Sequence, residues 1–334
     1  MNDVDIDSKL SSPDEDQFIT SLRATDWKEF YGQPKVMQSL SITLKAALER
    51  KEAVDHMLFY GPPGLGKTTL SHLIAKEMNS HLTVTSGTTL AKSSDLASIV
   101  TNLQPHDVLF IDEIHRLPKP VEELLYTAME DFALDIVIGK GPSARTVRLD
   151  LPQFTLVGAT TRFGSLSAPF RDRFGVIHRM EYYQPEELTH IIEQAAQKLD
   201  VKIDLESNLA LAKRSRGTPR IALKLLKRIR DFAQIKNQGK VSPEIVTSAL
   251  DLLAIDTVGL THADRTYLET IITRHKGGPI GLSTLSAALS EDSITIEEVV
   301  EPYLLQIGFI KKTPQGRVVH EAAYQHLGFE IPKR

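Results

Sequence analysis

The sequence predicts an α/β domain built on a parallel sheet, followed by an all-helical domain and a small domain of three helices and a β-hairpin. Three observations carry this prediction. Short apolar runs alternate with amphipathic helical segments up to about Met180, a pattern typical of a parallel sheet with crossover helices. The pattern becomes purely helical after Tyr183, and a basic hairpin pattern follows near the C-terminus. A chain of 334 residues is also long enough for two or three domains.

The α/β domain is expected to span residues 18–182. Its predicted strands are short apolar runs, as buried parallel strands are; they are Met57–Tyr60, Leu82–Ser86, Val108–Ile111, Phe154–Thr160 and Ile177–Met180. Residues 133–151 are expected to form a protruding β-hairpin, because apolar residues alternate on both sides of a turn at Gly139–Pro142. Residues 1–17 are acidic and serine-rich with few apolar groups, so we expect a disordered tail there.

The helical domain is expected over residues 183–254 and the last domain over residues 255–334. Helix-start signals such as Thr218-Pro219 precede amphipathic segments; the predicted helices are Pro185–Leu199, Leu205–Arg216, Pro219–Ile235 and Pro243–Leu253. In the last domain, the predicted helices His262–Arg274, Leu282–Leu289 and Ile296–Leu305 precede a hairpin at Phe309–Val319. Three helices and a basic hairpin are typical of a winged helix, a module that binds DNA in many proteins and docks onto proteins in others.

Composition excludes several classes of protein. Hydrophobic residues make up 41% of the chain and charged residues 25%, as in ordinary globular proteins, and no apolar run approaches the roughly 18 residues of a membrane span. The N-terminus lacks a basic-then-apolar signal sequence, and the absence of cysteine excludes disulfides and thiolate metal sites. We therefore expect a cytoplasmic protein without membrane contact. A net charge of −4 gives no global argument for nucleic-acid binding, which would have to come from local clusters or from repetition in an oligomer.

The octapeptide that begins at Gly61 carries the most specific chemistry. It fits the phosphate-binding loop G-x-x-x-x-G-K-[ST], in which glycines, here Gly61, Gly64 and Gly66, let backbone N–H groups surround a β-phosphate. Lys67 can then reach the β and γ oxygens, and the Thr68 hydroxyl can bind Mg²⁺. A buried strand precedes the loop and an amphipathic helix follows it, so the phosphate would lie over a helix N-terminus. Since no Asn/Thr-Lys-x-Asp guanine-binding motif is present, we expect ATP.

Two carboxylates, Asp112 and Glu113, end a buried strand. At such a position one acid can hold the water shell of Mg²⁺, and the next can polarise a water for in-line attack on the γ-phosphate. We assign the first role to Asp112 and the second to Glu113. Another strand ends in Thr160 and Thr161, where a hydroxyl can bond the γ-phosphate or the attacking water. The sequence does not decide between these two threonines.

Two basic positions complete the predicted site. A phosphoryl transition state needs positive charge on its equatorial oxygens, and an arginine supplied by a neighbour is worth about 10³–10⁵ in rate. Arg173 is the candidate and Arg171 the alternative; pairing of both with Asp172 in a surface turn would explain them without a catalytic role. Arg220 begins a helix, where a cation opposes the macrodipole and needs a compensating anion. That anion is either a nucleotide phosphate or a carboxylate.

These residues resemble those of the AAA+ ATPases and, more closely, those of the RuvB family of Holliday-junction branch-migration motors. The resemblance covers the chain from about Leu22 to Gly328. It is carried by Gly61–Thr69, Leu109–Leu117, Gly158–Arg162, Arg171–Gly175, Gly217–Arg220 and Gly308–Arg317. The core motifs are common to all AAA+ proteins, whereas the hairpin 133–151 together with the winged helix points to RuvB. Two departures are Ala24, where the family usually has proline, and Lys312, where arginine is common.

The resemblance implies a homo-oligomeric ring, usually a hexamer, that hydrolyses ATP with Mg²⁺ and pulls duplex DNA away from a four-way junction. Such a motor would work in the cytoplasm of bacteria, at the nucleoid. The resemblance implies further nucleotide-binding residues, which are Leu22, Arg23, Thr69, Glu130, Asp131, Phe132, Thr161, Tyr183 and Arg220. Leu22, Arg23 and Tyr183 would line the adenine pocket, and Arg220 would contact phosphates from the lid. Arg173 would act in trans on the nucleotide of the neighbouring subunit.

The resemblance also implies two partners. The hairpin 133–151 would dock onto the junction-binding protein RuvA, and Lys312 and Arg317 in the wing would contact the DNA backbone without reading sequence. Residues 255–334 contain eight Lys/Arg against ten Asp/Glu, so one winged helix should bind DNA weakly and lose affinity steeply in salt. Several copies in a ring and a partner would add avidity. The alternatives are a clamp-loader or initiator-type AAA+ ATPase and a winged-helix regulator that uses ATP only as a switch.

Overall fold

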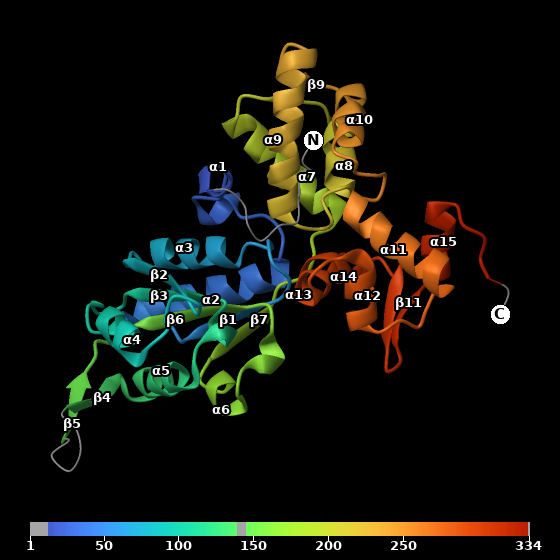
Figure 1. Cartoon of the computed structure of the whole chain (residues 1–334). Helices are drawn as coiled ribbons and strands as arrows, with labels where there is room; N and C mark the ends of the chain where they lie inside the picture. Colours follow the sequence, from blue (N-terminus) through green and yellow to red (C-terminus); the bar gives the residue numbers. More distant parts are fainter. Residues whose placement is uncertain (1–12, 139–144, 333–334) are drawn as a thin grey trace. The chain divides into compact units, whose positions relative to one another are not determined.

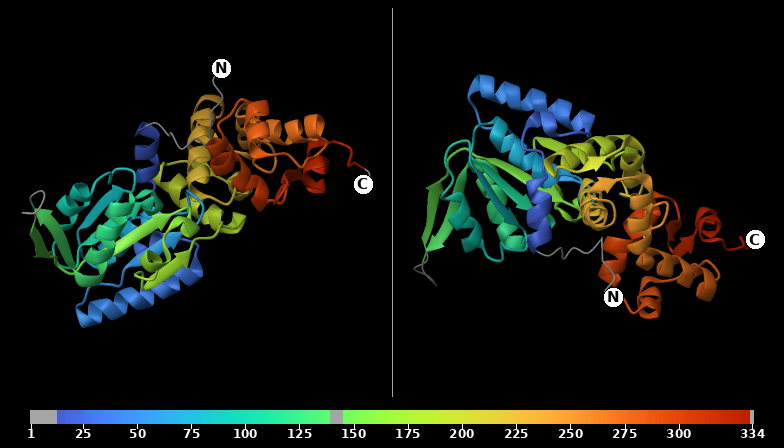
Figure 2. Two further views of the ribbon diagram at one scale, coloured as in Figure 1. Left: turned by 60° about the horizontal axis from the view of Figure 1, so that its bottom comes forward. Right: turned by 90° about the horizontal axis from the view of Figure 1, so that it is seen from above.

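The computed structural model of the chain describes residues 13–138 and 145–332. They form two compact units, the first Arg23–Tyr183 and the second made of residues 13–22 and 184–332, shown in Figures 1 and 2. Among the described helices, none combines the length and the apolar character that a membrane span requires.

A five-stranded parallel sheet forms the centre of the first unit. Its strands lie in the order β2-β3-β6-β1-β7, with the bounds β1 Met57–Tyr60, β2 Leu82–Ser86, β3 Val108–Asp112, β6 Thr155–Thr160 and β7 Val176–Arg179. Neighbouring strands all run parallel, so their carboxyl ends meet at one edge of the sheet. The predicted strands are confirmed, with ends shifted by at most one residue. The central strands β1, β3 and β6 are buried apolar runs, as expected of a parallel sheet, whereas the outer strands β2 and β7 have no buried residue.

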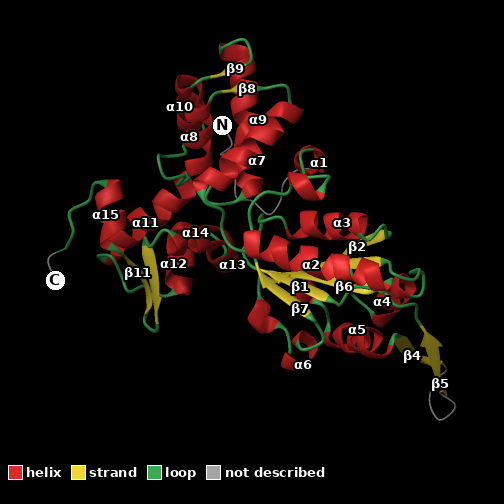
Figure 3. Ribbon diagram, turned by 180° about the vertical axis from the view of Figure 1, so that it is seen from behind, coloured by secondary structure: helices red, strands yellow, loops and turns green. Residues whose placement is uncertain are grey.

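Helices cover both faces of this sheet. They are α2 Pro34–Arg50, α3 Lys67–Glu77, α4 Ser93–Val100, α5 Lys119–Asp131 and the short α6 Ala168–Arg171, with 3₁₀ turns at Trp27–Glu29, Ile114–Arg116 and Phe163–Ser165. Figures 1 and 3 show α3 on one face of the sheet and α5 and α6 on the other. On that second face, Leu109 and Leu156 of the strands share a buried cluster with Leu96 of α4 and Leu125 of α5. Each fully buried leucine contributes about 1.5–3 kcal/mol, so this cluster fixes α4 and α5 on the sheet.

The predicted hairpin follows α5. Strand β4, Ala133–Ile138, pairs antiparallel with β5, Arg145–Asp150, which confirms the alternation seen in the sequence. The turn predicted at Gly139–Pro142 lies outside the described residues. Strand β5 is exposed along its whole length, so the apolar side chains of Val147 and Leu149 face solvent.

Helices dominate the second unit up to Leu252. They are α7 Pro185–Lys198, α8 Leu205–Lys213, α9 Pro219–Lys236 and α10 Pro243–Leu252. The one departure from the expected all-helical pattern is a parallel pair of two-residue strands, β8 Lys202–Ile203 and β9 Lys240–Val241. Each lies just before a helix, where the chain must be extended to enter the N-cap, and Val241 is buried.

The N-terminal segment differs from its prediction. A disordered tail is predicted through residue 17, but helix α1 spans Pro13–Ser21. Composition alone misses this helix because its acidic residues, 14–16, occupy the first turn, where negative charge complements the helix macrodipole. Glu15 also pairs with Lys224 and Arg228 of α9 at 3.4 and 3.3 Å. The rest of the predicted tail, residues 1–12, lies outside the described residues.

The C-terminal part of the second unit has the expected winged-helix arrangement. Its elements are α11 His262–His275, α12 Leu282–Leu289, α13 Ser293–Thr295, a π-helical turn Ile296–Val300, α14 Glu301–Gln306, β10 Ile310–Thr313, β11 Gly316–Val319 and α15 Glu321–Leu327. The helix predicted as continuous over Ile296–Leu305 is interrupted, because Pro302 cannot donate a hydrogen bond to the turn before it. A bridge between Ile280 and Arg317 ties the hairpin to the helices.

Candidate nucleotide-binding site and DNA-binding wing

The phosphate loop joins β1 to α3 and depends on its glycines. Gly61, Gly64 and Gly66 have φ angles of 141°, 79° and 96°, a region that residues with side chains rarely adopt. A Cβ on Gly61 would lie 2.5 Å from Met180 O, and one on Gly66 would lie 3.2 Å from the Phe30 ring. The backbone conformation therefore favours glycine at all three positions, and at Gly61 the Met180 carbonyl also leaves no space for a side chain.

Lys67 lies inside the loop that would hold phosphate. Only 7% of its surface is exposed, and its Nζ donates to Gly61 O at 2.9 Å and to Pro62 O at 2.7 Å. Burial lowers the pKa of Lys67 from 10.5 to about 8, although the charges of Asp112 and Glu113 act in the opposite direction. A phosphate bound in the loop would supply the anion that restores the full positive charge.

Asp112 ends β3, and Glu113 begins the turn that follows. Burial raises the pKa of Asp112, and the Glu113 N–H, which donates to Asp112 Oδ1 at 2.9 Å, opposes this rise. Glu113 has a φ of 51°, an uncommon left-handed conformation that is concentrated at functional sites. Its Oε2 lies 2.9 Å from Arg116 Nε and 3.6 Å from His115 Nε2. The structure thus places both carboxylates at the sheet edge where the phosphate loop lies.

His115 joins the ends of β3 and β6. Its Nδ1 lies 2.9 Å from Thr160 Oγ1, which also accepts a hydrogen bond from Arg162 N–H at 3.0 Å. Thr160 is 1% exposed, and its hydroxyl bonds groups of the protein at the end of β6. Thr161, the other threonine that the sequence offers for the γ-phosphate, is half-buried at the same edge.

Tyr183, which the family resemblance assigns to the adenine pocket, packs against the phosphate loop. It is 4% exposed, and its hydroxyl donates to Leu65 O at 3.2 Å. A Cβ on Gly32 would lie 2.3 Å from the Tyr183 ring, so the segment before α2 lies directly on this ring. Burial lowers the pKa of His72, and the charge of Arg23 lowers it further, which places Arg23 near α3.

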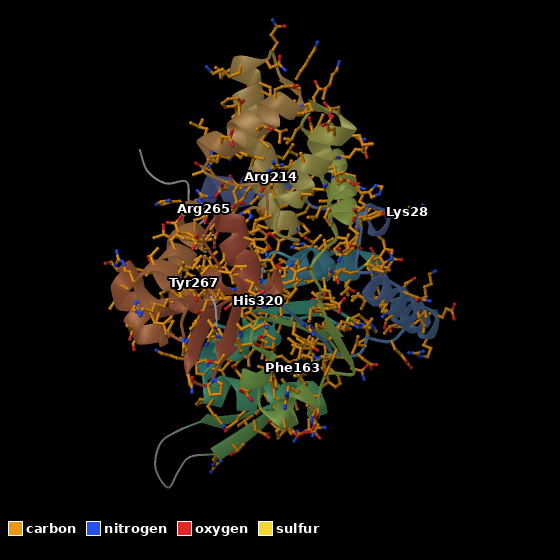
Figure 4. The ribbon with its side chains drawn as sticks, turned by 90° about the vertical axis from the view of Figure 1, so that its right-hand side faces the viewer. Lys28, Phe163, Arg214, Arg265, Tyr267 and His320 are labelled. Atoms are coloured by element: carbon orange, nitrogen blue, oxygen red, sulfur yellow. The ribbon has the colours of Figure 1, made fainter. Side chains whose placement is uncertain are left out.

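Arg173 and Arg171, the two candidates for the arginine supplied to a neighbouring subunit, each lie on an aromatic ring. Arg173 Nη2 pairs with Glu130 Oε1 at 2.9 Å and donates to the Tyr126 hydroxyl, while its guanidinium lies 4.6 Å from the centre of the Tyr126 ring. Arg171 lies over the ring of Phe163 at 4.9 Å, the residue labelled in Figure 4. Arg173 therefore pairs with Glu130 and Tyr126 rather than with Asp172, the partner that the sequence suggested.

Arg173 and residues 130–132 lie at the sheet edge opposite to the chain's own phosphate loop. Phe132 is 6.0 Å from His56 between ring centres; His56 precedes β1, whereas the loop follows β1. A rise of about 3.3 Å per residue puts roughly 13 Å between the two ends of this strand. Asp131 pairs with an arginine of β5, and Glu130 holds Arg173. The structure does not bring these residues to their own loop, so a nucleotide that they contact would belong to another subunit.

The donors expected for Mg²⁺ fit that ion. Thr68 and Thr69 lie half-buried in the first turn of α3, and Asp112 ends β3. Across residues 13–138 and 145–332, no group of three or more His, Cys, Asp or Glu side chains could hold a metal. One hydroxyl and one carboxylate suit Mg²⁺, which takes one or two protein oxygens and completes its shell with water and substrate phosphates.

The two predicted DNA-binding residues of the wing share one buried carboxylate. Lys312 Nζ lies 2.6 Å from Glu301 Oε2, and Arg317 Nε lies 2.7 Å from Glu301 Oε1. Burial acts to raise the pKa of Glu301, but hydrogen bonds from Arg317 and Lys312 outweigh it and hold that pKa below its ordinary value. The Lys312 side chain is 43% exposed and that of Arg317 only 12%. Arg317 therefore anchors the hairpin, and Lys312 is the cation that solvent reaches.

Arg220, at the start of α9, has a carboxylate as its compensating anion. Its Nη2 lies 3.0 Å from Asp16 Oδ1 of α1. The basic face of α9 continues with Lys224 and Arg228, which both pair with Glu15. Helix α1 thus covers the arginine that the resemblance assigns to nucleotide phosphates.

Three residues of the site were not predicted. His115 and Arg116 contact Glu113 from within one turn. Because they directly follow Asp112 and Glu113 in the sequence, their position could have indicated these contacts. Gln33 bonds Glu181 through both atoms of its amide, at 2.6 and 3.1 Å; these residues lie far apart in the chain, and nothing local indicates the pair. Leu22, predicted for the adenine pocket, is 8% exposed.

A parallel sheet with the phosphate loop after β1 and the acidic pair after the adjacent-but-one strand β3 defines an AAA+ ATPase of the P-loop class. Family comparison makes this specific. Residues 22–180 match the Holliday junction DNA helicase RuvB P-loop domain, residues 183–256 the RuvB AAA lid domain, and residues 257–328 the RuvB C-terminal winged helix domain. The chain belongs to the RuvB family.

Solved structures agree with this assignment. The Thermotoga maritima RuvB Holliday junction branch migration motor is 49% identical with a TM-score of 0.85, over 93% of this chain and 100% of that chain. A single-substitution variant of Thermotoga maritima RuvB is 50% identical with a TM-score of 0.86, over 93% and 99% of the two chains.

Proposed function

We propose that this chain is the ATPase subunit of a homo-oligomeric ring, a hexamer as its resemblance to RuvB suggests, that drives branch migration of Holliday junctions. One observation carries the proposal. Lys67, Asp112 and Glu113 lie at one edge of the sheet, and Arg173 lies at the other. A subunit built this way completes its site only with a neighbour. A ring of head-to-tail contacts gives every subunit that neighbour.

The residues then divide the reaction among them. The ATP phosphates would lie in the loop from Gly61 to Thr68. Thr68 and, through water, Asp112 would hold Mg²⁺, which would neutralise phosphate charge. Glu113 polarises the attacking water, Thr161 bonds the γ-phosphate, and the neighbour's equivalent of Arg173 stabilises the transition state. The remaining nucleotide contacts are those of Leu22, Arg23, Thr69, Tyr183 and Arg220, with Glu130, Asp131 and Phe132 facing the neighbour's nucleotide.

Two surfaces serve the partners. Strand β5 exposes 39% of Val147 and 38% of Leu149, and exposed apolar side chains on a hairpin support docking of a RuvA-like junction-binding protein. Lys312 contacts the phosphates of duplex DNA without reading sequence, with Arg317 holding the hairpin in place. Such a motor acts in the cytoplasm, at the nucleoid.

The test is ATP-dependent dissociation of a labelled synthetic four-way junction by the full-length chain, with and without a RuvA-type partner. We expect dissociation with ATP and Mg²⁺, enhanced by the partner and lost in Glu113→Gln. A clamp loader would instead place a ring on primed DNA, and a switch regulator would not need Glu113 or Arg173. Absence of ATP-dependent dissociation with the partner present would exclude the proposed function.

A further inference from the structure

The guanidinium of Arg216 joins the lid helices to the winged helix. Arg216 lies between α8 and α9, just before the segment Gly217–Arg220, and it has a left-handed φ of 52°. Its side chain is only 4% exposed. Nε donates to Gly259 O at 2.7 Å, and Nη2 donates to Asp264 Oδ2. The guanidinium also lies over the Tyr303 ring, 4.8 Å from its centre.

The partners of Arg216 lie on two helices of the winged helix. Asp264 is in the first turn of α11, is 1% exposed, and accepts from Thr261 N–H at 2.7 Å and Thr261 Oγ1 at 2.6 Å. Tyr303 is on α14, and its hydroxyl donates to Val258 O. One arginine of the lid therefore contacts both the start of α11 and the middle of α14.

The same two helices hold the wing. Glu301 is on α14, two residues before Tyr303, and is fully buried. It accepts from the Tyr267 hydroxyl of α11 at 3.0 Å and pairs with both wing cations, Lys312 and Arg317. Arg216 and the wing are thus linked through one pair of helices that is cross-bonded by Tyr267, the residue labelled in Figure 4.

We propose that Arg216 is a positioning residue that transmits the nucleotide state of the lid to the DNA-binding wing. This inference rests on the proposed function, in which Arg220 contacts the nucleotide and Lys312 contacts DNA. Arg216 lies in the turn that leads directly into α9, four residues before Arg220, so a shift of the start of α9 displaces the guanidinium. A buried guanidinium and carboxylate do not separate without a large unfavourable desolvation imbalance. The lid loop, α11 and α14 therefore move together, and the wing moves with them.

The test measures coupling in the full-length protein. DNA affinity is determined with a non-hydrolysable ATP analogue and with ADP, and the ratio of the two dissociation constants is compared among variants. Arg216→Met combined with Asp264→Asn removes both charges of the pair. Arg216→Lys keeps the positive charge but loses the planar guanidinium that donates to Gly259 and Asp264 at once. The matched control is Arg214→Met, because Arg214, labelled in Figure 4, directly follows α8 and donates back to Ala210 O of that helix at 3.0 Å.

We expect a wild-type ratio within the range of about 5- to 150-fold that is usual for coupled sites. It should fall to about twofold or less in the double variant, with an intermediate value in Arg216→Lys and an unchanged value in Arg214→Met. DNA-free ATP hydrolysis and the melting temperature should stay near wild type, while junction dissociation falls at least about tenfold.

Three results would overturn the proposal. The first is a ratio of the two DNA dissociation constants that stays at the wild-type value in both the double variant and Arg216→Lys. Another is a parallel fall of DNA-free hydrolysis, both DNA affinities and the melting temperature in both variants, which would show a merely structural role. A ratio near one in the wild type would overturn the proposed function too, because the wing would then sense no nucleotide state.

Discussion

Glu113 Oε2 and Arg116 Nε form an ion pair at 2.9 Å within a single turn at the end of β3. A guanidinium that pairs with a carboxylate holds both side chains in one geometry. The residue proposed to polarise the attacking water is therefore restrained in this structure. Its left-handed backbone, with a φ of 51°, also limits how the carboxylate can be presented.

We predict opposite effects for two substitutions at this pair. Glu113→Gln should bind ATP normally and hydrolyse it about 10²–10⁴ times more slowly, because an amide cannot act as a general base. Arg116→Ala should raise DNA-free hydrolysis, since it releases the carboxylate. Single-turnover hydrolysis together with nucleotide binding measures both effects. Near-normal turnover in Glu113→Gln would remove its assigned role, and an unchanged rate in Arg116→Ala would show that the ion pair restrains nothing.

Arg173→Ala should act on a neighbour rather than on its own subunit. Its side chain lies at the sheet edge opposite to its own phosphate loop, so loss of the guanidinium should slow the adjacent site by about 10³–10⁵. Mixed with wild type at increasing fractions, the variant should reduce ATPase activity more than dilution does. Arg171→Ala, on the same loop but over Phe163, is the control. A linear loss of activity with fraction would argue against catalysis in trans.

Lys67 should take up a proton when ATP binds at mildly alkaline pH. Burial lowers its pKa to about 8 in the nucleotide-free protein, and bound phosphates would raise it again. Binding enthalpies measured at pH 8.5 in two buffers of different ionisation enthalpy should therefore differ. In Lys67→Arg, whose charge is permanent, they should agree. Equal enthalpies in the wild type would contradict the prediction.

The same pKa fixes the sign of a stability effect. The unfolded chain holds the Lys67 proton up to about pH 10.5, and the folded chain only to about pH 8. Between these values the unfolded state binds more protons, so the free energy of unfolding of the nucleotide-free protein should rise with pH through this window as far as Lys67 is concerned.

Substitution of Arg317 should mainly reduce stability, whereas substitution of Lys312 should mainly reduce DNA affinity. Arg317→Ala leaves Glu301 buried with one partner fewer and should destabilise the winged helix by about 3–5 kcal/mol. Lys312→Ala also removes a partner of Glu301, but that partner is 43% exposed, so it should destabilise the fold less than Arg317→Ala does. It should weaken DNA binding equally across sequences and reduce its salt dependence. Chemical denaturation and salt-dependent DNA titrations separate the two effects, with exposed Lys311→Ala as the control. Sequence-selective loss in Lys312→Ala would contradict backbone contact.

Local motifs explain why the sequence alone could indicate a candidate nucleotide-binding site. The phosphate loop and the pair Asp112-Glu113 each carry their chemistry within a few residues and follow apolar strands. Because those strands are parallel, their ends had to meet at one edge. The wing shows the limit of such reasoning. Counting charges over residues 255–334 could not show that Glu301 lies beneath both Lys312 and Arg317.

Contacts between distant segments were out of reach for a different reason. The Tyr183 hydroxyl bonds Leu65 O across 118 residues, and Gln33 bonds Glu181 across 148. No periodicity or spacing records such pairs. Helix α1 was missed because its acidic composition is typical of disorder, and its stability comes from the basic face of α9, which only the folded chain brings to it.

Helix α1 should compete with the nucleotide for Arg220. The Asp16–Arg220 pair is largely exposed, with side-chain exposures of 57% and 35%, so it is worth about 0–1 kcal/mol. Asp16→Asn should therefore raise ATP affinity by up to about fivefold if Arg220 contacts the phosphates. Asp14→Asn, in the same turn, is the control for a general charge effect. Nucleotide titration of both variants and of Arg220→Ala decides the matter: the gain should vanish when Asp16→Asn is combined with Arg220→Ala, and a gain that persists there would show that α1 acts on some other group.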